Sequence, residues 1–105
     1  MASVIEIRRF RVKAGEEQAF LEDRARMMEV LRSRFPEMRD ICLARLDDGA
    51  WVAVASWGSR EDADRASAEA ADIPAFGALI THIEDEGPTI ERGMLAQGVA
   101  GVASR

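Results

Sequence analysis

Apolar and polar positions change period along the chain, and each change predicts a change of secondary structure. Val4 to Val12 is rich in β-branched and apolar residues and stops at Lys13-Ala14-Gly15, which predicts a strand and its exit. From Glu16 to Arg34 the apolar residues recur at helical spacing. Pro36 follows, so the pattern predicts an amphipathic helix that ends just before the proline.

This helix has one apolar side, which indicates that it packs against a sheet. The apolar stripe is made by Phe20, Met27, Leu31 and Phe35, widened by Leu21 and Met28. The residues expected to face away from the core are Glu17, Asp23, Arg24 and Arg32.

Two further apolar runs predict a β-hairpin. They are Met38 to Leu46 and Trp51 to Trp57, and Asp47-Asp48-Gly49-Ala50 separates them. Because Asp-Gly is a strong turn signal between two such runs, we expect the two strands to pair antiparallel.

A second, Ala-rich helix is expected to begin after the hairpin and to break once. Ser59 stands at its N-cap with Asp62 three residues on, and the helix runs through Ala71. Pro74 interrupts it, and the pattern resumes from Ala75 to Ile83.

Turn chemistry from Glu84 to Pro88 leads into a last predicted strand, Thr89 to Leu95. The resulting β-α-β-β-α-β order predicts an α+β, ferredoxin-like sandwich with a four-stranded antiparallel sheet and its helices on one face. At 105 residues there is room for one domain, residues 1–96, followed by a small Gly/Ala/Val-rich tail at 97–105.

The predicted strands carry apolar residues on both faces, although the chain's own helices can cover only one. In the first strand Ile5 and Ile7 oppose Val4, Phe10 and Val12; in the hairpin Ile41 and Leu43 oppose Met38, Cys42, Ala44 and Leu46, and Val52 and Val54 oppose Trp51, Ala53, Ala55 and Trp57. A contiguous apolar face is unusual in a monomer. We therefore expect a homodimer in which two sheets pack face to face, forming a dimeric α/β barrel; the alternative is a monomer with small exposed apolar side chains.

Composition excludes several classes of function. With 19 acidic and 14 basic side chains the net charge is -5, which disfavours nucleic acid and anionic membranes as partners. The single cysteine, Cys42, cannot form an internal disulfide, and no His/Cys cluster suggests a metal site. No segment approaches the roughly 18 apolar residues of a membrane span. We expect a cytoplasmic protein.

Two segments carry a family resemblance. One is the opening strand, Val4 to Lys13, leading into Gly15-Glu16-Glu17; the other is Trp57 to Ala63, where a tryptophan precedes a short polar turn and an acidic helix start. In these the chain resembles the antibiotic biosynthesis monooxygenase family of dimeric α/β-barrel proteins. The resemblance covers roughly Val4 to Leu95 as a pattern of elements.

The resemblance implies an oxygenase that needs no cofactor. Members that oxidise aromatic polyketides use neither metal nor flavin: the substrate, as its phenolate or carbanion, passes an electron to oxygen in a dry pocket. Trp57 would line that pocket. The family's proton-handling tyrosines have no counterpart, because the chain has no Tyr. In the haem-degrading branch an asparagine and a histidine stand where this chain has Arg8 and Ala66.

Six residues are candidates for the site. His82, the only histidine, is the candidate general base, and Trp57 the candidate catalytic pocket residue; their alternatives are a helix-end or surface role for His82 and core filling for Trp57. The substrate-binding candidates are Arg9, Phe20, Met27 and Phe76. Alternation places Arg8 opposite Arg9, so the strand's arginines cannot form one patch, and ion pairing is their alternative role. Cys42 is expected to pack inertly in a buried strand.

Three functions remain open at this stage. The leading one is a cofactor-independent monooxygenase acting on a small hydrophobic, aromatic or quinol-like substrate. The second is a non-catalytic domain that binds a small hydrophobic molecule or another partner on the same dimeric scaffold. Haem degradation is a weaker third.

Overall fold

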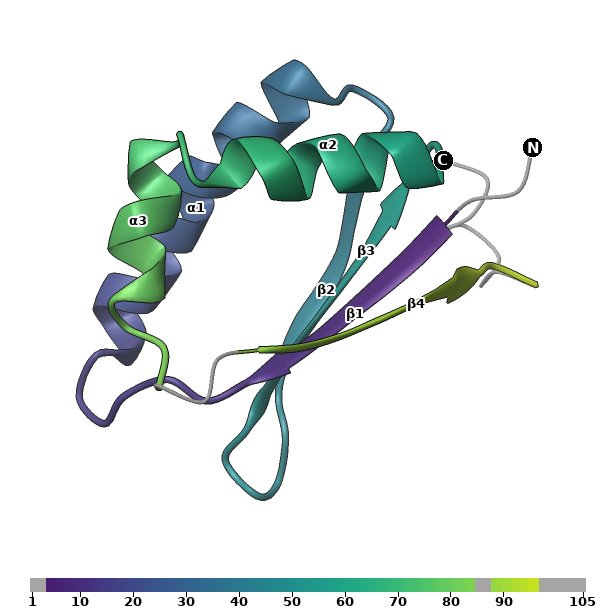
Figure 1. The fold of residues 1–105 in the computed structure, drawn as a ribbon. Coiled ribbons are helices and arrows are strands. Elements are labelled where there is room, and N and C mark those ends of the chain that lie inside the picture. The colour runs from purple at the N-terminus through teal and green to yellow at the C-terminus, as the bar shows by residue number, and fades with distance from the viewer. Residues whose placement is uncertain (1–3, 85–87, 97–105) are drawn as a thin grey trace.

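A computed structural model of the chain describes residues 4–84 and 88–96, and its elements follow the predicted order (Figure 1). They are β1 (Val4–Phe10), α1 (Glu17–Arg34), β2 (Arg39–Arg45), β3 (Trp51–Trp57), α2 (Arg60–Ala70), α3 (Pro74–Ile80) and β4 (Thr89–Met94). The predicted tail at 97–105 and residues 85–87 of the predicted turn lie outside the described residues.

The four strands form one antiparallel sheet in the order β2-β3-β1-β4. The three described helices lie on the same face of this sheet, with α3 alongside α1, and no other described element covers the opposite face (Figure 1). The predicted α+β, ferredoxin-like fold is therefore confirmed.

Local signals behave as the sequence predicts. Gly49 adopts a φ of +89° in the hairpin turn, a value that glycine accepts without steric strain. The hydroxyl of Ser59 accepts a hydrogen bond from the backbone N–H of Asp62 at 3.1 Å and caps α2. The predicted break is complete, because Pro74 begins a separate helix, α3.

Two predicted elements are shorter than expected for one shared reason. In β1 the last pair is Phe10 with Trp51, and since β3 begins at Trp51 the strand has no partner beyond it. Val12 instead forms an isolated bridge with Ile83. That bridge draws Ile83 out of helical geometry, and α3 ends at Ile80.

The assignment of β1 and β3 to two faces is confirmed, whereas that of β2 is wrong in part. Val4 and Phe10 are buried towards the helices, and Ile7 on the other face is 39% exposed. A β-bulge between Asp40 and Cys42 shifts the register of β2. Met38 therefore lies in the core, while Cys42 is exposed on the open face rather than packed in a buried strand.

The core has two clusters, one at each end of β3. The Trp57 cluster contains Val4, Met28, Leu31, Phe35, Met38 and Trp57, with Phe35 packed edge-on against Trp57 at 5.6 Å between ring centroids. The Trp51 cluster contains Phe10, Val12, Phe20, Trp51 and Leu79. Between the two tryptophans the helix-facing residues of β3 are only alanines, Ala53 and Ala55.

The Trp51 cluster should depend strongly on Phe20, which is 1% exposed and lies 5.4 Å from Phe10 and 5.5 Å from Trp51 between ring centroids. Phe20→Ala should lower the free energy of unfolding by about 3–5 kcal/mol, because the lost transfer energy adds to the energy of the cavity left behind. Urea unfolding measures this loss. Leu21→Ala, one residue on but 39% exposed, is the control and should change stability by less than about 1 kcal/mol.

Candidate functional site

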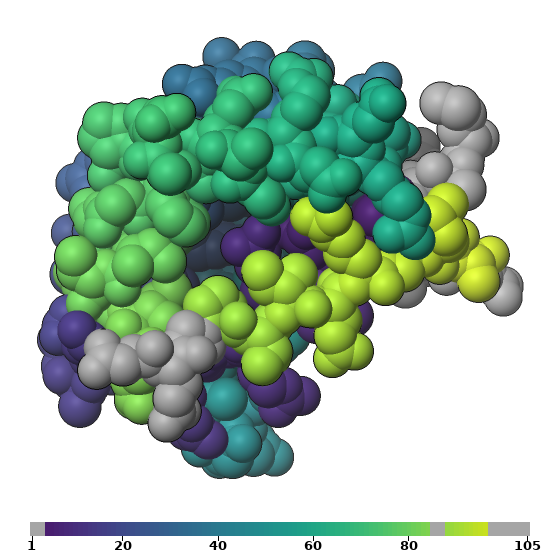
Figure 2. All heavy atoms as spheres, in the orientation of Figure 1, coloured from purple at the N-terminus to yellow at the C-terminus, as the bar shows by residue number. Residues whose placement is uncertain are grey.

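A cavity of about 410 Å³ lies between the helices and the sheet, between the two core clusters. Figure 2 shows the molecule hollowed between α2, α3 and β4, with atoms of β1 visible at the bottom. Ile80 and Ile90 line the cavity and are 40% and 48% exposed, so they form an apolar rim. The cavity exists because Ala53 and Ala55 are too small to fill the space between Trp51 and Trp57.

The structure brings four of the six candidate residues together. Trp57, Phe20, Met27 and Phe76 all line the cavity, and Met27 and Phe76 pack against both core clusters. Arg9 and His82 do not line it. Arg9 is exposed on the open face of the sheet, because strand alternation turns it away from the helices.

Trp57 combines burial with an unpaired polar atom. The side chain is 4% exposed, and among the described residues its indole nitrogen Nε1 is the buried side-chain polar atom without a hydrogen-bond partner. A buried N–H without a partner is destabilising and is rare in folded proteins. The nitrogen is almost closed to solvent, so an acceptor atom of a bound molecule would reach it only after neighbouring side chains shift.

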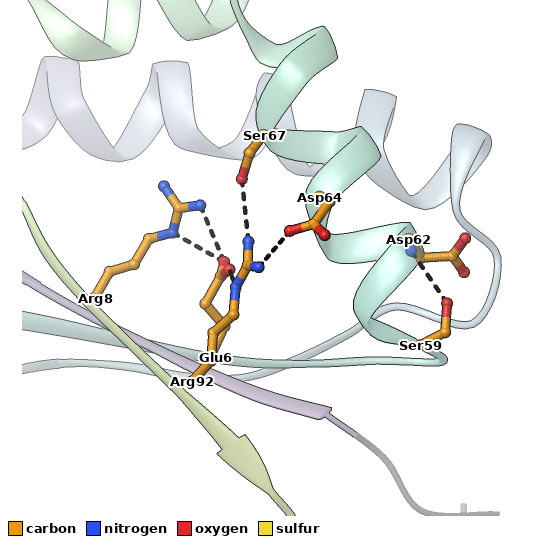
Figure 3. A network of polar contacts seen from close by, with 7 residues as sticks. All are labelled: Glu6, Arg8, Ser59, Asp62, Asp64, Ser67 and Arg92. Atoms are coloured by element: carbon orange, nitrogen blue, oxygen red, sulfur yellow. Dashed lines mark hydrogen bonds and ion pairs between the residues drawn. The ribbon is translucent and has the colours of Figure 1, made fainter.

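A polar corner, which sequence reasoning missed, interrupts the apolar lining (Figure 3). Glu6 is only 3% exposed, and its carboxylate lies between two guanidinium groups. Arg8 donates to Glu6 Oε1 from Nε at 3.1 Å and lies at 3.0 Å from the same oxygen through Nη2. Arg92 donates from Nε to Glu6 Oε2 at 2.8 Å. The pairs satisfy a charge that burial would otherwise make very costly.

Arg92 also joins the sheet to α2. Its Nη1 donates to Asp64 and its Nη2 to the hydroxyl of Ser67 at 3.4 Å (Figure 3). The hydrogen bonds to Asp64 and Glu6 raise the pKa of Arg92 above its usual value, so the cation is held firmly. These contacts lie beside the mouth of the cavity, since Ser67 also lines it.

One sequence signal could have found this corner. Alternation puts Glu6 and Arg8 on the same face as Val4 and Phe10, which is the buried face. Polar residues at buried positions mark either paired charges or a site. What alternation does not supply is the partner, because Arg92 lies 86 residues away in sequence.

A second ion pair lies on the cavity wall and corrects an expectation for α1. Arg24, expected to face outward, donates to both carboxylate oxygens of Asp40, at 3.2 Å and 2.9 Å. Both side chains are largely buried, at 15% and 18% exposed. The pair ties α1 to β2, and the long arginine side chain lets a residue beside the apolar stripe reach the sheet.

His82 lies in the turn after α3, where both ring nitrogens meet carboxylates. Nδ1 lies 2.8 Å from Glu16 and Nε2 lies 2.8 Å from Asp23, so Asp23 also does not face outward as expected. The hydrogen bonds that the imidazole donates to Glu16 and Asp23 raise the pKa of His82. This arrangement, here called the His82 clamp, ties the end of α3 to α1 and leaves neither nitrogen free to act on a molecule in the cavity.

Across residues 4–84 and 88–96, no cluster of three or more His, Cys, Asp or Glu side chains could hold a metal ion. In the same ranges no helix has both the length and the apolar character needed to cross a membrane.

The chain has a ferredoxin-like α+β fold with a cavity between helices and sheet, and solved structures of the same fold are found by comparison. None of the known protein-family models matches the chain, and no curated protein does either. The resemblance seen in the sequence is confirmed through solved structures.

The structural neighbours include candidate antibiotic biosynthesis monooxygenases, a cofactor-independent oxygenase and NIPSNAP family proteins. A candidate antibiotic biosynthesis monooxygenase from Bordetella bronchiseptica superposes with a TM-score of 0.73 at 18% identity, covering 94% of this chain and 99% of that one. SnoaB, a cofactor-independent oxygenase from Streptomyces nogalater, gives 0.65 at 24% identity, covering 96% and 99%. A NIPSNAP family protein from Agrobacterium tumefaciens gives 0.61 at 17% identity, covering 91% and 93%. At these identities the likeness establishes the fold.

The His82 clamp should give stability a pH dependence of defined sign. Unfolded, the imidazole titrates near its usual pKa of about 6.5, whereas in the fold it keeps its proton to higher pH. The contribution of the clamp is therefore fully present below about pH 6.5 and is lost as the pH rises through the folded-state pKa. Urea unfolding at about pH 5.5 and about pH 9 should show His82→Gln clearly less stable than wild type at the lower pH and closer to it at the higher.

An equal difference between wild type and His82→Gln at both pH values would contradict the clamp. Glu16→Gln and Asp23→Asn are matched variants, because each removes one of the two charges that stabilise the imidazolium. Each should lower the pKa of His82, which NMR titration of the single imidazole measures directly.

Proposed function

We propose that this chain is a cofactor-independent monooxygenase that oxidises a small hydrophobic, aromatic or quinol-like substrate in the helix-sheet cavity. The observation that carries this proposal is the mainly apolar cavity that Trp57 lines, together with the buried indole N–H of that residue, which has no partner among the described residues. An apolar cavity with a few polar groups is typical of small-molecule sites. The aromatic rings of Trp57, Phe20 and Phe76 suit a planar substrate, and Met27 adapts to its shape.

The proposed chemistry needs only substrate and oxygen. A substrate carbanion or phenolate passes one electron to O₂, and the two radicals combine as a hydroperoxide. When a methylene carbon is oxidised, loss of water from the hydroperoxide leaves a carbonyl, so CH₂ and O₂ become C=O and H₂O with no other reductant. In this scheme a shift of the Trp57 ring lets its N–H donate to the substrate oxygen on which negative charge develops. The helices and the apolar lining exclude water.

A non-catalytic ligand-binding domain is the second candidate, and one observation favours it. The ionisable groups that line the cavity are all in ion pairs: Glu6 with Arg8, and Arg24 with Asp40. The described cavity wall therefore presents no carboxylate or imidazole that is free to remove a proton. As a monooxygenase, the protein would require a substrate acidic enough to ionise with little help.

Oxygen uptake in the presence of anthrone or a hydroquinone tests the leading candidate. Wild type should consume oxygen with saturation kinetics. Trp57→Phe keeps an aromatic ring but removes the N–H, and kcat/KM should fall about tenfold, as expected for one lost hydrogen bond of about 1.4 kcal/mol. The comparison is made on variants that unfold cooperatively.

Trp51→Phe is the matched control, because Trp51 ends the same strand but does not line the cavity. It should leave kcat/KM within about twofold of wild type. Saturable binding of these compounds without oxygen uptake would replace the oxygenase by the ligand-binding domain, and no binding would exclude both.

We further propose that the protein works as a homodimer through the open face of its sheet. The centre of this face is apolar: Ile7 is 39% exposed, Val54 is its partner on β3, and Ile5 and Val52 lie on the same face. The helices of the chain cannot reach this face (Figure 1). A second copy would bury it in a self-complementary contact.

Sedimentation at micromolar concentration should give the mass of two chains for wild type. Ile7→Asp places a charge at the centre of the face and should give single chains, because burying an unpaired carboxylate opposes association. Leu21→Asp introduces the same charge at an equally exposed position on α1 and should remain dimeric. A wild type that sediments as single chains would exclude this interface.

A further inference from the structure

The polar corner of the cavity contains one hydrogen-bond donor that the fold does not use. Arg92 engages all three of its nitrogens, with Glu6, Asp64 and Ser67. Arg8 engages Nε and Nη2 with Glu6, whereas its Nη1 has no partner among residues 4–84 and 88–96. In Figure 3 this nitrogen points away from Glu6, towards the helices.

The ion pairs of the corner leave Arg8 only partly neutralised. Arg92 pairs with both Glu6 and Asp64, whereas Arg8 shares the Glu6 carboxylate with Arg92 and, within the described residues, has no carboxylate of its own. Arg8 is 31% exposed and lines the cavity, so its guanidinium lies where a molecule in the cavity can reach it.

A guanidinium group selects a particular kind of partner. Its N–H groups form a planar fork that matches the oxygens of a carboxylate or a phenolate, and it remains charged at any physiological pH. The carboxylate of Glu6 holds the Arg8 side chain in place through two of its nitrogens. The loss of side-chain freedom on binding a ligand is correspondingly small.

We propose that the cavity binds an aromatic anion, with its ring among Trp57, Met27 and Phe76 and its carboxylate or phenolate oxygen on Nη1 of Arg8. Ser67 lies at the same corner, and its hydroxyl, which accepts from Arg92, still has a hydrogen to donate to that oxygen. Arg8 thus determines specificity, and Glu6 positions it. The inference rests on the proposed function only in taking the cavity as the ligand site.

The test compares 1-naphthoate with 1-naphthamide, which has the same ring system and nearly the same shape but no charge. Isothermal titration calorimetry should show wild type binding naphthoate about tenfold more tightly. In Arg8→Gln the preference should disappear, with naphthoate falling to the affinity of naphthamide. Glu6 keeps its contact with Arg92 in this variant, so no buried carboxylate loses its only cation.

Arg32→Gln is the matched control for the loss of one positive charge. Arg32 is exposed in the last turn of α1 and is outside the cavity lining, so the naphthoate preference should persist. Naphthamide binding to Arg8→Gln shows that the cavity of the variant is intact. A second readout needs no variant: in NMR spectra of wild type, the Arg8 Nε–H resonance should shift with naphthoate and not with naphthamide.

The outcomes separate this inference from the proposed function. If both compounds bind wild type equally, or if the preference survives Arg8→Gln, the anion site is wrong while the cavity remains a ligand site. If the Arg8 resonance does not respond to naphthoate, the anion site is also wrong. If neither compound binds, the cavity is not an aromatic site, and this inference and the proposed function fall together.

Discussion

The buried carboxylate of Glu6 is the constraint on which the middle of this molecule depends. At 3% exposure it needs cationic partners, and Arg8 and Arg92 supply them from its own strand and from β4. Removing one partner of a buried ion pair typically destabilises a protein by about 3–5 kcal/mol. Because Arg92 reaches on to Asp64, the same interaction fixes the edge of the sheet to α2. The helix-facing middle of β1, where aliphatic side chains usually pack, is instead occupied by the hydrogen-bonded polar corner beside the cavity.

The wall of the cavity on the α3 side is held by different interactions from those of its floor. The seven residues of α3 are separated from α2 by a break at Pro74 and are tied to α1 by the His82 clamp. The backbone N–H of Lys13 donates to the carbonyl of His82 at 2.8 Å, which joins the same turn to the segment after β1. The protonation state of one imidazole therefore bears on how firmly this wall is held, without the imidazole contacting anything in the cavity.

Sequence reasoning succeeded where the deciding interaction is local. The hairpin turn at Gly49, the cap at Ser59 and the break at Pro74 depend on residues within a few positions, and all three are present. It failed where partners are distant in sequence. The residues next to Glu6 in sequence do not indicate that Arg92 is its partner, and those next to His82 do not indicate Glu16 or Asp23. The residues next to Cys42 do not indicate the bulge that shifts its strand.

The candidate site follows the same division. The apolar members Trp57, Phe20, Met27 and Phe76 were predicted from periodicity and resemblance, because aromatic and methionine side chains on a buried face necessarily meet under the helices. The polar members were not, since choosing Arg8 over Arg9 requires knowing that a buried carboxylate lies on the same face. A single sequence shows which positions are apolar, but it does not show which charged residues pair with one another.

The helix-facing row of β3 is Trp51-Ala53-Ala55-Trp57. Its tryptophans support the fold, and its alanines determine the size of the molecule that the cavity can accept. Trp57 at one end lines the cavity and Trp51 at the other end belongs to the adjoining core cluster, while the alanine methyl groups between them set the depth of the cavity. Replacing either alanine by a larger residue during evolution would reduce the volume of the cavity and leave both tryptophans unchanged. Proteins with this arrangement can therefore diverge in the ligands that they bind while they keep the same fold.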